Sequence, residues 1–180
     1  MPLSSEEAAQ ALHEIETTQS RSSTLRRYQD GAPHLLLWAV LWAVSYGMTF
    51  FASARATAIW AVVVGVGLVA GVALLFRTKG AAWAWRYLAA FGVLAVFCVA
   101  TVLVLHPVHD RRVGAFVPLV VAMAYVLGGL WWGGRFIVAG VVLAALTVAG
   151  YFMLREYFPL WMALVGGVTL LLSGLWLRRA

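Results

Sequence analysis

The chain has 180 residues, of which 63% are hydrophobic and 11% are charged, and its formal net charge is +6. Soluble domains are about half apolar and about one quarter charged, so this composition excludes an ordinary soluble protein and indicates a membrane protein. The single cysteine, Cys98, excludes an intramolecular disulfide and a cysteine-rich metal site.

Residues 1–33 are predicted to form a cytosolic helical arm before the membrane. A helix over about residues 5–29 carries an apolar seam whose spacings alternate between four and three residues. Gly31 and Pro33 are expected to end this helix. The seam is narrow and polar in its middle, and it consists of Ala11, Ile15, Thr18, Ser22 and Leu25.

Two interpretations of the arm remain open. It is either an interfacial, partly frayed helix that only sets topology, or a docking arm for a cytosolic protein or a second copy of the chain. Its acidic residues precede its arginines, an order that suits the helix dipole and brings positive charge to anionic lipid. In the docking interpretation, the contact residues are Ala11, Leu12, Ile15 and Leu25.

Six apolar stretches follow, and each is long enough to cross ~30 Å of hydrocarbon as a helix. They lack the alternating pattern of an outer-membrane barrel. The predicted fold is therefore all-α, a polytopic bundle of six transmembrane helices in one domain over residues 34–180. The predicted spans are about 35–54, 56–76, 84–105, 113–133, 136–154 and 157–177.

The first span has the most polar face of the predicted bundle. Ser45, Thr49 and Ser53 recur at intervals of four, and an aromatic stripe lies beside them. Small hydroxylated residues commonly let membrane helices approach closely, so the stripe is either packing or the lining of a ligand path. The aromatic members of this candidate lining are Trp38, Trp42 and Tyr46.

Small residues four apart in later spans predict further close helix contacts, within one chain or between copies. The pairs are Gly67 with Gly71, Gly129 with Gly133, Gly140 with Ala144, and Ala163 with Gly167. Two spans share an ending, Gly129-Leu130-Trp131 and Gly174-Leu175-Trp176, through either common boundary chemistry or an old duplication.

The segment LHPVHDRR, residues 105–112, is the densest polar stretch between spans. His106, His109 and Asp110, with Glu156 on the same predicted face, could bind a divalent metal. Pro107 interrupts the helix that would align the histidines, and the neighbouring arginines oppose a cation. We therefore favour a polar turn over a metal site.

The distribution of basic residues predicts the topology. Nine of the thirteen Lys and Arg residues fall on the side that holds both termini, which places both termini in the cytoplasm of a bacterial inner membrane. The basicity then reflects topology and contact with the lipid bilayer, so no nucleic-acid partner is expected.

No catalytic constellation is found, and no ionisable residue lies in the middle of a span. We expect no enzyme activity and no cofactor, with a divalent metal as the weaker alternative. The favoured function is a regulatory, sensing or assembly protein whose N-terminal helix docks a partner. The alternative is a small-solute transporter or channel lined by the stripe of the first span, and a homo-oligomer is compatible with both.

Overall fold

The computed structural model describes residues 5–78, 81–105 and 110–179, and it is helical apart from short turns within these ranges. The elements are α1 (Ser5–Phe51), the 3-10 turn η1 (Ser53–Arg55), α2 (Ala56–Thr78), α3 (Ala81–Leu105), α4 (Asp110–Trp132), α5 (Gly134–Met153), α6 (Phe158–Trp161), the π-helical turn η2 (Met162–Gly166) and α7 (Gly167–Arg178). Six segments are long and apolar enough to cross a membrane, the last combining α6, η2 and α7. The prediction of an all-helical protein with six helices long and apolar enough to cross a membrane is therefore confirmed over the described residues.

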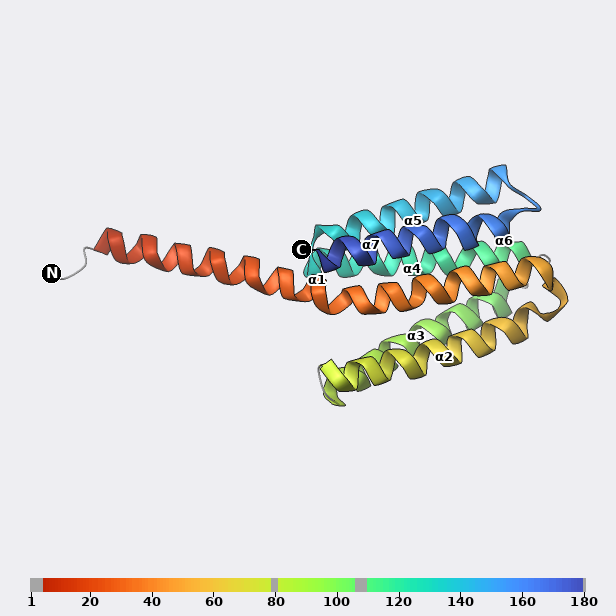
Figure 1. Cartoon of the computed structure of the whole chain (residues 1–180), viewed down its shortest axis with the longest axis horizontal. Helices are drawn as coiled ribbons and strands as arrows, with labels where there is room; N and C mark the ends of the chain where they lie inside the picture. Colours follow the sequence, from red (N-terminus) through yellow and green to blue (C-terminus); the bar gives the residue numbers. More distant parts are fainter. Residues whose placement is uncertain (1–4, 79–80, 106–109, 180) are drawn as a thin grey trace.

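Four of the six candidate spans contribute side chains to one buried core, and Figure 1 shows their helices lying together. The first and last helices, α1 and α7, pack along each other, and α4 packs along α5. The buried apolar cluster draws its side chains from α1, α4, α5 and the α6–α7 span. The largest fully buried side chains include Phe158, Leu143 and Leu170. The bundle is thus closed by contact between the two ends of the chain.

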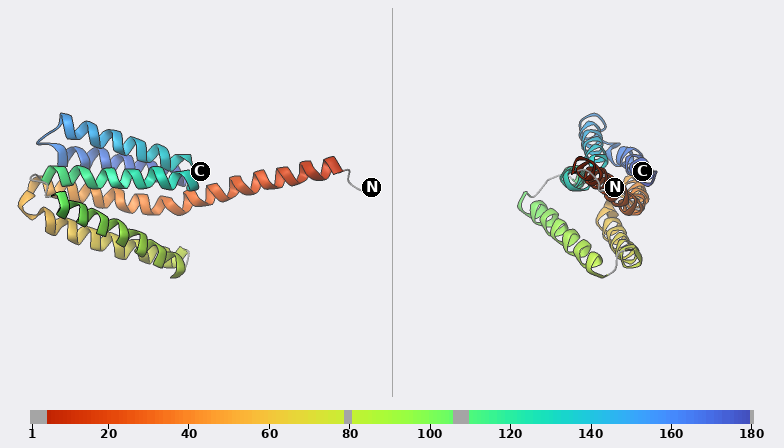
Figure 2. Two further views of the ribbon diagram at one scale, coloured as in Figure 1. Left: turned by 180° about the vertical axis from the view of Figure 1, so that it is seen from behind. Right: turned by 90° about the vertical axis from the view of Figure 1, so that its left-hand side faces the viewer.

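Helices α2 and α3 form a hairpin beside this core (Figure 2). Helix α2 packs against α1 and α3, while no residue in the apolar stretch Trp85–Val104 of α3 is buried within the chain. The hairpin supplies no side chain to the main buried cluster. In a membrane, lipid solvates such an apolar helix without the penalty that water would impose.

Helix α1 is continuous from Ser5 to Phe51, so the expected break at Gly31 and Pro33 is wrong. A proline inside a helix removes one backbone hydrogen bond, here the one to the Gln29 carbonyl four residues earlier. Gln29 and Pro33 are both exposed, so solvent can satisfy that carbonyl and the helix bends without ending. Figure 1 shows the change of direction where α1 meets the bundle.

A second proline, Pro118, is compensated by a side chain of another helix rather than by solvent. Pro118 lies within α4 and has no N–H to donate to the Gly114 carbonyl. The hydroxyl of Tyr46 on α1 donates to that carbonyl at 2.7 Å, and Tyr46 is buried. A freed backbone carbonyl in a membrane span needs such a partner, so this bond ties α1 to α4.

Glycines allow the closest approach between α4 and α5. A Cβ atom on Gly140 would lie 2.6 Å from the backbone oxygen of Ala122, which leaves no room for a larger residue. Gly133 joins the two helices at φ 123°, a conformation that favours glycine. The small-residue pairs around Gly129 and Gly140 therefore serve packing within one chain.

Candidate functional site

The arm extends from the bundle as the first part of α1 and stands clear of the other helices (Figures 1 and 2). The candidate membrane span that begins within the arm runs 40 residues from Leu12 to Phe51, and at 1.5 Å per residue this is about twice the thickness of the hydrocarbon core. Leu12 and Ile15 are each 61% exposed and Leu25 is 39% exposed. The side chain of Ala11 lies outside the described residues. Three of the four predicted docking residues therefore form an uncovered apolar surface.

The base of the arm is held by a group of residues that we call the collar: Arg27, Tyr28, Gly133, Arg135 and Trp176. The Arg27 guanidinium donates to the Trp131 carbonyl on α4 at 2.6 Å. Tyr28 is buried, and its ring lies 5.9 Å from that of Phe136. Gly133 is needed here because a Cβ atom would lie 2.2 Å from the Tyr28 hydroxyl oxygen.

Arg135 completes the collar by joining α5, α1 and α7. Its guanidinium carbon lies 5.2 Å from the Tyr28 ring centre and 4.8 Å from the Trp176 ring centre. Its Nη1 also donates to the Trp176 carbonyl at 2.7 Å. Cation–π contacts on two rings and a charged hydrogen bond hold this side chain in one geometry. The arm therefore continues into the core through a fixed joint.

The two arginines of the collar also stabilise helix ends. The last four carbonyls of a helix have no intrahelical partner, and positive charge near them is favourable. Arg27 occupies this position for α4 and Arg135 for α7. The shared Gly-Leu-Trp endings thus have a common physical role, since each tryptophan carbonyl accepts a hydrogen bond from an arginine of another helix.

The hydroxyl stripe of the first span runs from a buried position at Ser45 through the half-buried Thr49 to the exposed Ser53. Ser45 is buried and donates to the Leu41 carbonyl, and Thr49 donates to the Ser45 carbonyl at 2.7 Å. Both hydroxyls thus bond to their own helix. Ser53 lies beyond the end of α1, in η1, and is exposed. The stripe therefore contributes two bonded hydroxyls at a helix interface.

The aromatic residues beside the stripe pack against other helices. Trp42 is buried with its ring 5.9 Å from that of Tyr46, and Tyr46 lies 4.8 Å from Trp60 on α2. Trp38 stacks on Phe91 of α3 at 5.8 Å. These contacts join the α2–α3 hairpin to the core, and they occupy the faces that a ligand would need.

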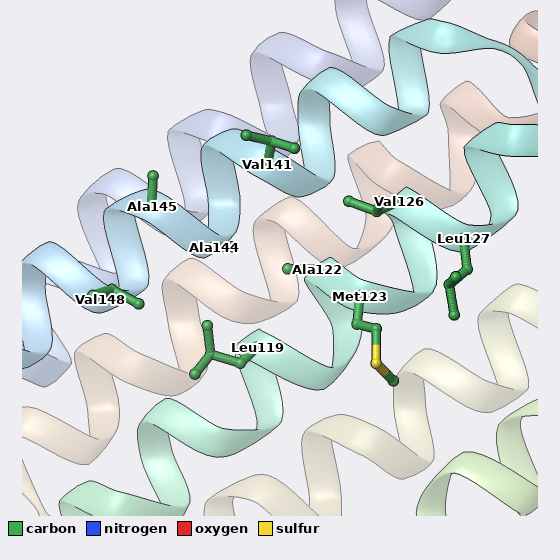
Figure 3. Close-up of a pocket in the computed structure, with 9 residues that line it drawn as sticks. All are labelled: Leu119, Ala122, Met123, Val126, Leu127, Val141, Ala144, Ala145 and Val148. Carbon is green, nitrogen blue, oxygen red and sulfur yellow. The ribbon is translucent and has the colours of Figure 1, made fainter.

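A groove of about 570 Å³ runs between α4 and α5 (Figure 3), and no residue of the stripe lines it. Its floor is made by small residues such as Ala122 and Ala144, and valine, leucine and methionine form its sides. An apolar groove of this kind can accept an acyl chain or another helix, but it offers no side-chain hydrogen bond to orient a polar solute. Its lining residues are Leu119, Ala122, Met123, Val126, Leu127, Val141, Ala144, Ala145 and Val148.

The predicted metal ligands are only partly described. His106 and His109 lie outside the described residues, and Asp110 begins α4 with its side chain likewise outside the description. Glu156 is exposed in the turn between α5 and α6. Within the described part of the chain, no three metal-binding side chains come together. The choice between a polar turn and a metal site at residues 105–112 stays a prediction.

No family model matches the chain, and neither a curated protein nor a solved structure matches it. Functional inference therefore depends on the arm, the collar and the packing described above. The collar is the feature that sequence reasoning missed, because Arg27 and Arg135 were counted only as charges that set topology. The Gly-Leu-Trp endings were a usable signal, since each marks a helix end whose carbonyls need a donor.

Proposed function

We propose that the chain is a bacterial inner-membrane protein with both termini in the cytoplasm, which acts without catalysis in regulation, sensing or assembly. Its N-terminal helix docks a protein partner. The observation that carries this proposal is an exposed apolar seam on a helix that continues, through a fixed joint, into the core of the bundle. A helix present only for topology would need neither the seam nor the joint.

The collar couples the arm, where the partner docks, to the helices of the bundle. A partner that moves the arm acts on Arg27 and Tyr28, which contact the ends of α4 and α5. Helices are stiff over a few turns, so a force on the arm acts on the collar. The alternative function, a solute path along the first span, has less support because the Ser45 and Thr49 hydroxyls bond to their own helix.

Partner capture by variants of the full-length protein tests the proposal. The Leu12→Glu, Ile15→Glu variant should insert and fold normally but lose capture of its partner in a pull-down from solubilised membranes. The matched control is Gln10→Glu, Thr17→Glu, which adds the same charge on the other side of the helix at exposed positions. A chain without residues 2–24 keeps the collar and should also lose capture. Equal capture by the truncated and full-length chains would remove the support for docking.

A further inference from the structure

The charges that flank the arm's seam carry an inference that rests on the proposed docking function. Membrane proteins of one topology present their arms in the same direction, so two copies would pair in parallel along the seam. In a parallel pair, a residue directly before a seam position on one helix faces a residue directly after a later seam position on the other helix. These flanking positions decide which partners are accepted.

Self-pairing would bring like charges together. Arg21 precedes the seam residue Ser22, and Arg26 follows the seam residue Leu25. In a parallel pair, Arg21 of one copy would face Arg26 of the other, once on each side of the pair. One heptad earlier, Glu14 would face the neutral Gln19. A pair of identical arms thus gains no flanking ion pair here and places two arginine pairs in contact.

The collar prevents the arm from avoiding this repulsion by turning about its axis. Arg27, the neighbour of Arg26, is bonded to the Trp131 carbonyl, and Tyr28 is buried against Phe136. The rotational position of α1 is therefore set by the core, and Arg26 stays exposed beside the collar. Like charges that meet across a helix pair select against that pairing.

An anionic lipid surface fits the arm less well than a protein helix does. The arm projects along the line of the bundle and away from it (Figure 1). Glu14 is exposed on it, and the sequence places Glu6, Glu7 and Glu16 in the same half. Anionic headgroups repel such a segment. A helix of opposite charge order satisfies both halves of the arm at once.

We propose that the seam of the arm binds an amphipathic helix of a different protein, which presents carboxylates opposite Arg21 and Arg26 and a basic residue opposite Glu14. The membrane-proximal half of the partner helix is acidic and its distal half is basic. The apolar seam supplies contact area, and the flanking charges exclude a second copy of this chain from the site.

Two synthetic helical peptides test the charge selection. Both carry an apolar seam matched to the arm; one places Glu opposite Arg21 and Arg26, and the other places Lys there. Full-length protein in phosphatidylcholine nanodiscs should bind the Glu peptide at least about tenfold more tightly by fluorescence anisotropy. An Arg21→Glu, Arg26→Glu variant should reverse the preference. The control Arg178→Glu, Arg179→Glu, which makes the same charge change off the arm, should keep it.

Cross-linking tests the exclusion of a second copy. With Cys98→Ser removing the native thiol, Thr18→Cys places one thiol on the exposed seam. Oxidation should leave these arms unlinked, and adding Arg26→Glu should produce linked dimers because Arg21 then faces a carboxylate. Dimers through residue 18 without that change would make a second copy the occupant and overturn the inference. So would equal binding of the two peptides, or binding of neither. The docking function itself fails separately, if the truncated chain still captures its partner.

Discussion

The bond between Tyr46 and the Gly114 carbonyl offers a quantitative test of how the bundle is held together. Tyr46→Phe removes one hydroxyl and leaves the ring, so the packing against Trp42 and Trp60 is preserved. The variant leaves the Gly114 carbonyl without its donor, because Pro118 cannot supply an N–H. The free energy of unfolding should therefore fall.

The expected decrease in the free energy of unfolding follows from the length and burial of this hydrogen bond. A typical hydrogen bond contributes about 0.5–1.5 kcal/mol net, and interhelical bonds in membrane proteins average about 0.6 kcal/mol with a maximum near 1.7. A short bond of 2.7 Å from a buried tyrosine to an otherwise unpaired backbone carbonyl belongs in the upper part of this range. We expect a loss of about 1 kcal/mol.

A double-mutant cycle with Pro118→Ala isolates the cause. Alanine at position 118 restores an N–H for the Gly114 carbonyl, so Tyr46→Phe should cost less than about 0.5 kcal/mol in that background. The assay is reversible unfolding in mixed detergent micelles. Tyr157→Phe, at a residue that is 58% exposed, is the control and should change little. An equal cost of Tyr46→Phe in the two backgrounds would refute the assignment of this hydroxyl to the carbonyl freed by proline.

Three further predictions follow from the packing. Gly140→Ala places a Cβ atom 2.6 Å from a backbone oxygen of α4, so it should lower the free energy of unfolding by about 1–3 kcal/mol in the same assay. The control Gly65→Ala, with nothing within 4 Å of the added Cβ atom, should be neutral or slightly stabilising. Arg135→Gln removes two cation–π contacts, so it should lower the free energy of unfolding by about 1–2 kcal/mol. The same variant should increase the mobility of a spin label on the arm, and an unchanged spectrum would count against the collar as a joint. Ser45→Ala with Thr49→Val should leave solute flux in liposomes unchanged, and a clear impairment would favour the transport alternative.

The spans were predictable because their signal is local. Each apolar stretch is long enough to cross hydrocarbon, and its helical state follows from the need to satisfy backbone groups there. The ends of the helices agree with the predicted spans to within a few residues. The exception is the first, where α1 begins at Ser5 and runs on through residues 29–33, whose composition resembles a helix break. Gln29 and Pro33 are exposed, so solvent can satisfy the carbonyl that the proline leaves without a helical partner.

The arrangement of the spans was not predictable from the same signal. Short links suggest antiparallel neighbours, yet α1 packs most extensively on α7, the last helix in the chain. That contact depends on the shapes of two surfaces far apart in sequence, such as Gly174 against Leu36. The separation of the α2–α3 hairpin is likewise a property of packing, since its helices are as apolar as those of the core.

The candidate docking residues were visible in the sequence, whereas the collar was not. Ile15 lies on the periodic seam and Leu12 directly follows the seam residue Ala11, so an exposed apolar surface on this helix could be anticipated. The collar requires the ends of α4, α5 and α7 to meet at the base of the arm, and no spacing along the chain encodes that meeting. Arg135 illustrates the difficulty, because one side chain serves three helices that are remote in sequence.

Site-specific photo-cross-linking in cells tests docking by the arm most directly. A photoreactive amino acid replaces Ile15 on the seam or Leu12 beside it, and Gln10 or Thr17 on the other side of the same helix, in the full-length protein in its own membrane. The proposal predicts one adduct of constant mass from positions 12 and 15, and none from positions 10 and 17. The absence of an adduct at all four positions, or the same adducts at all four, would contradict it.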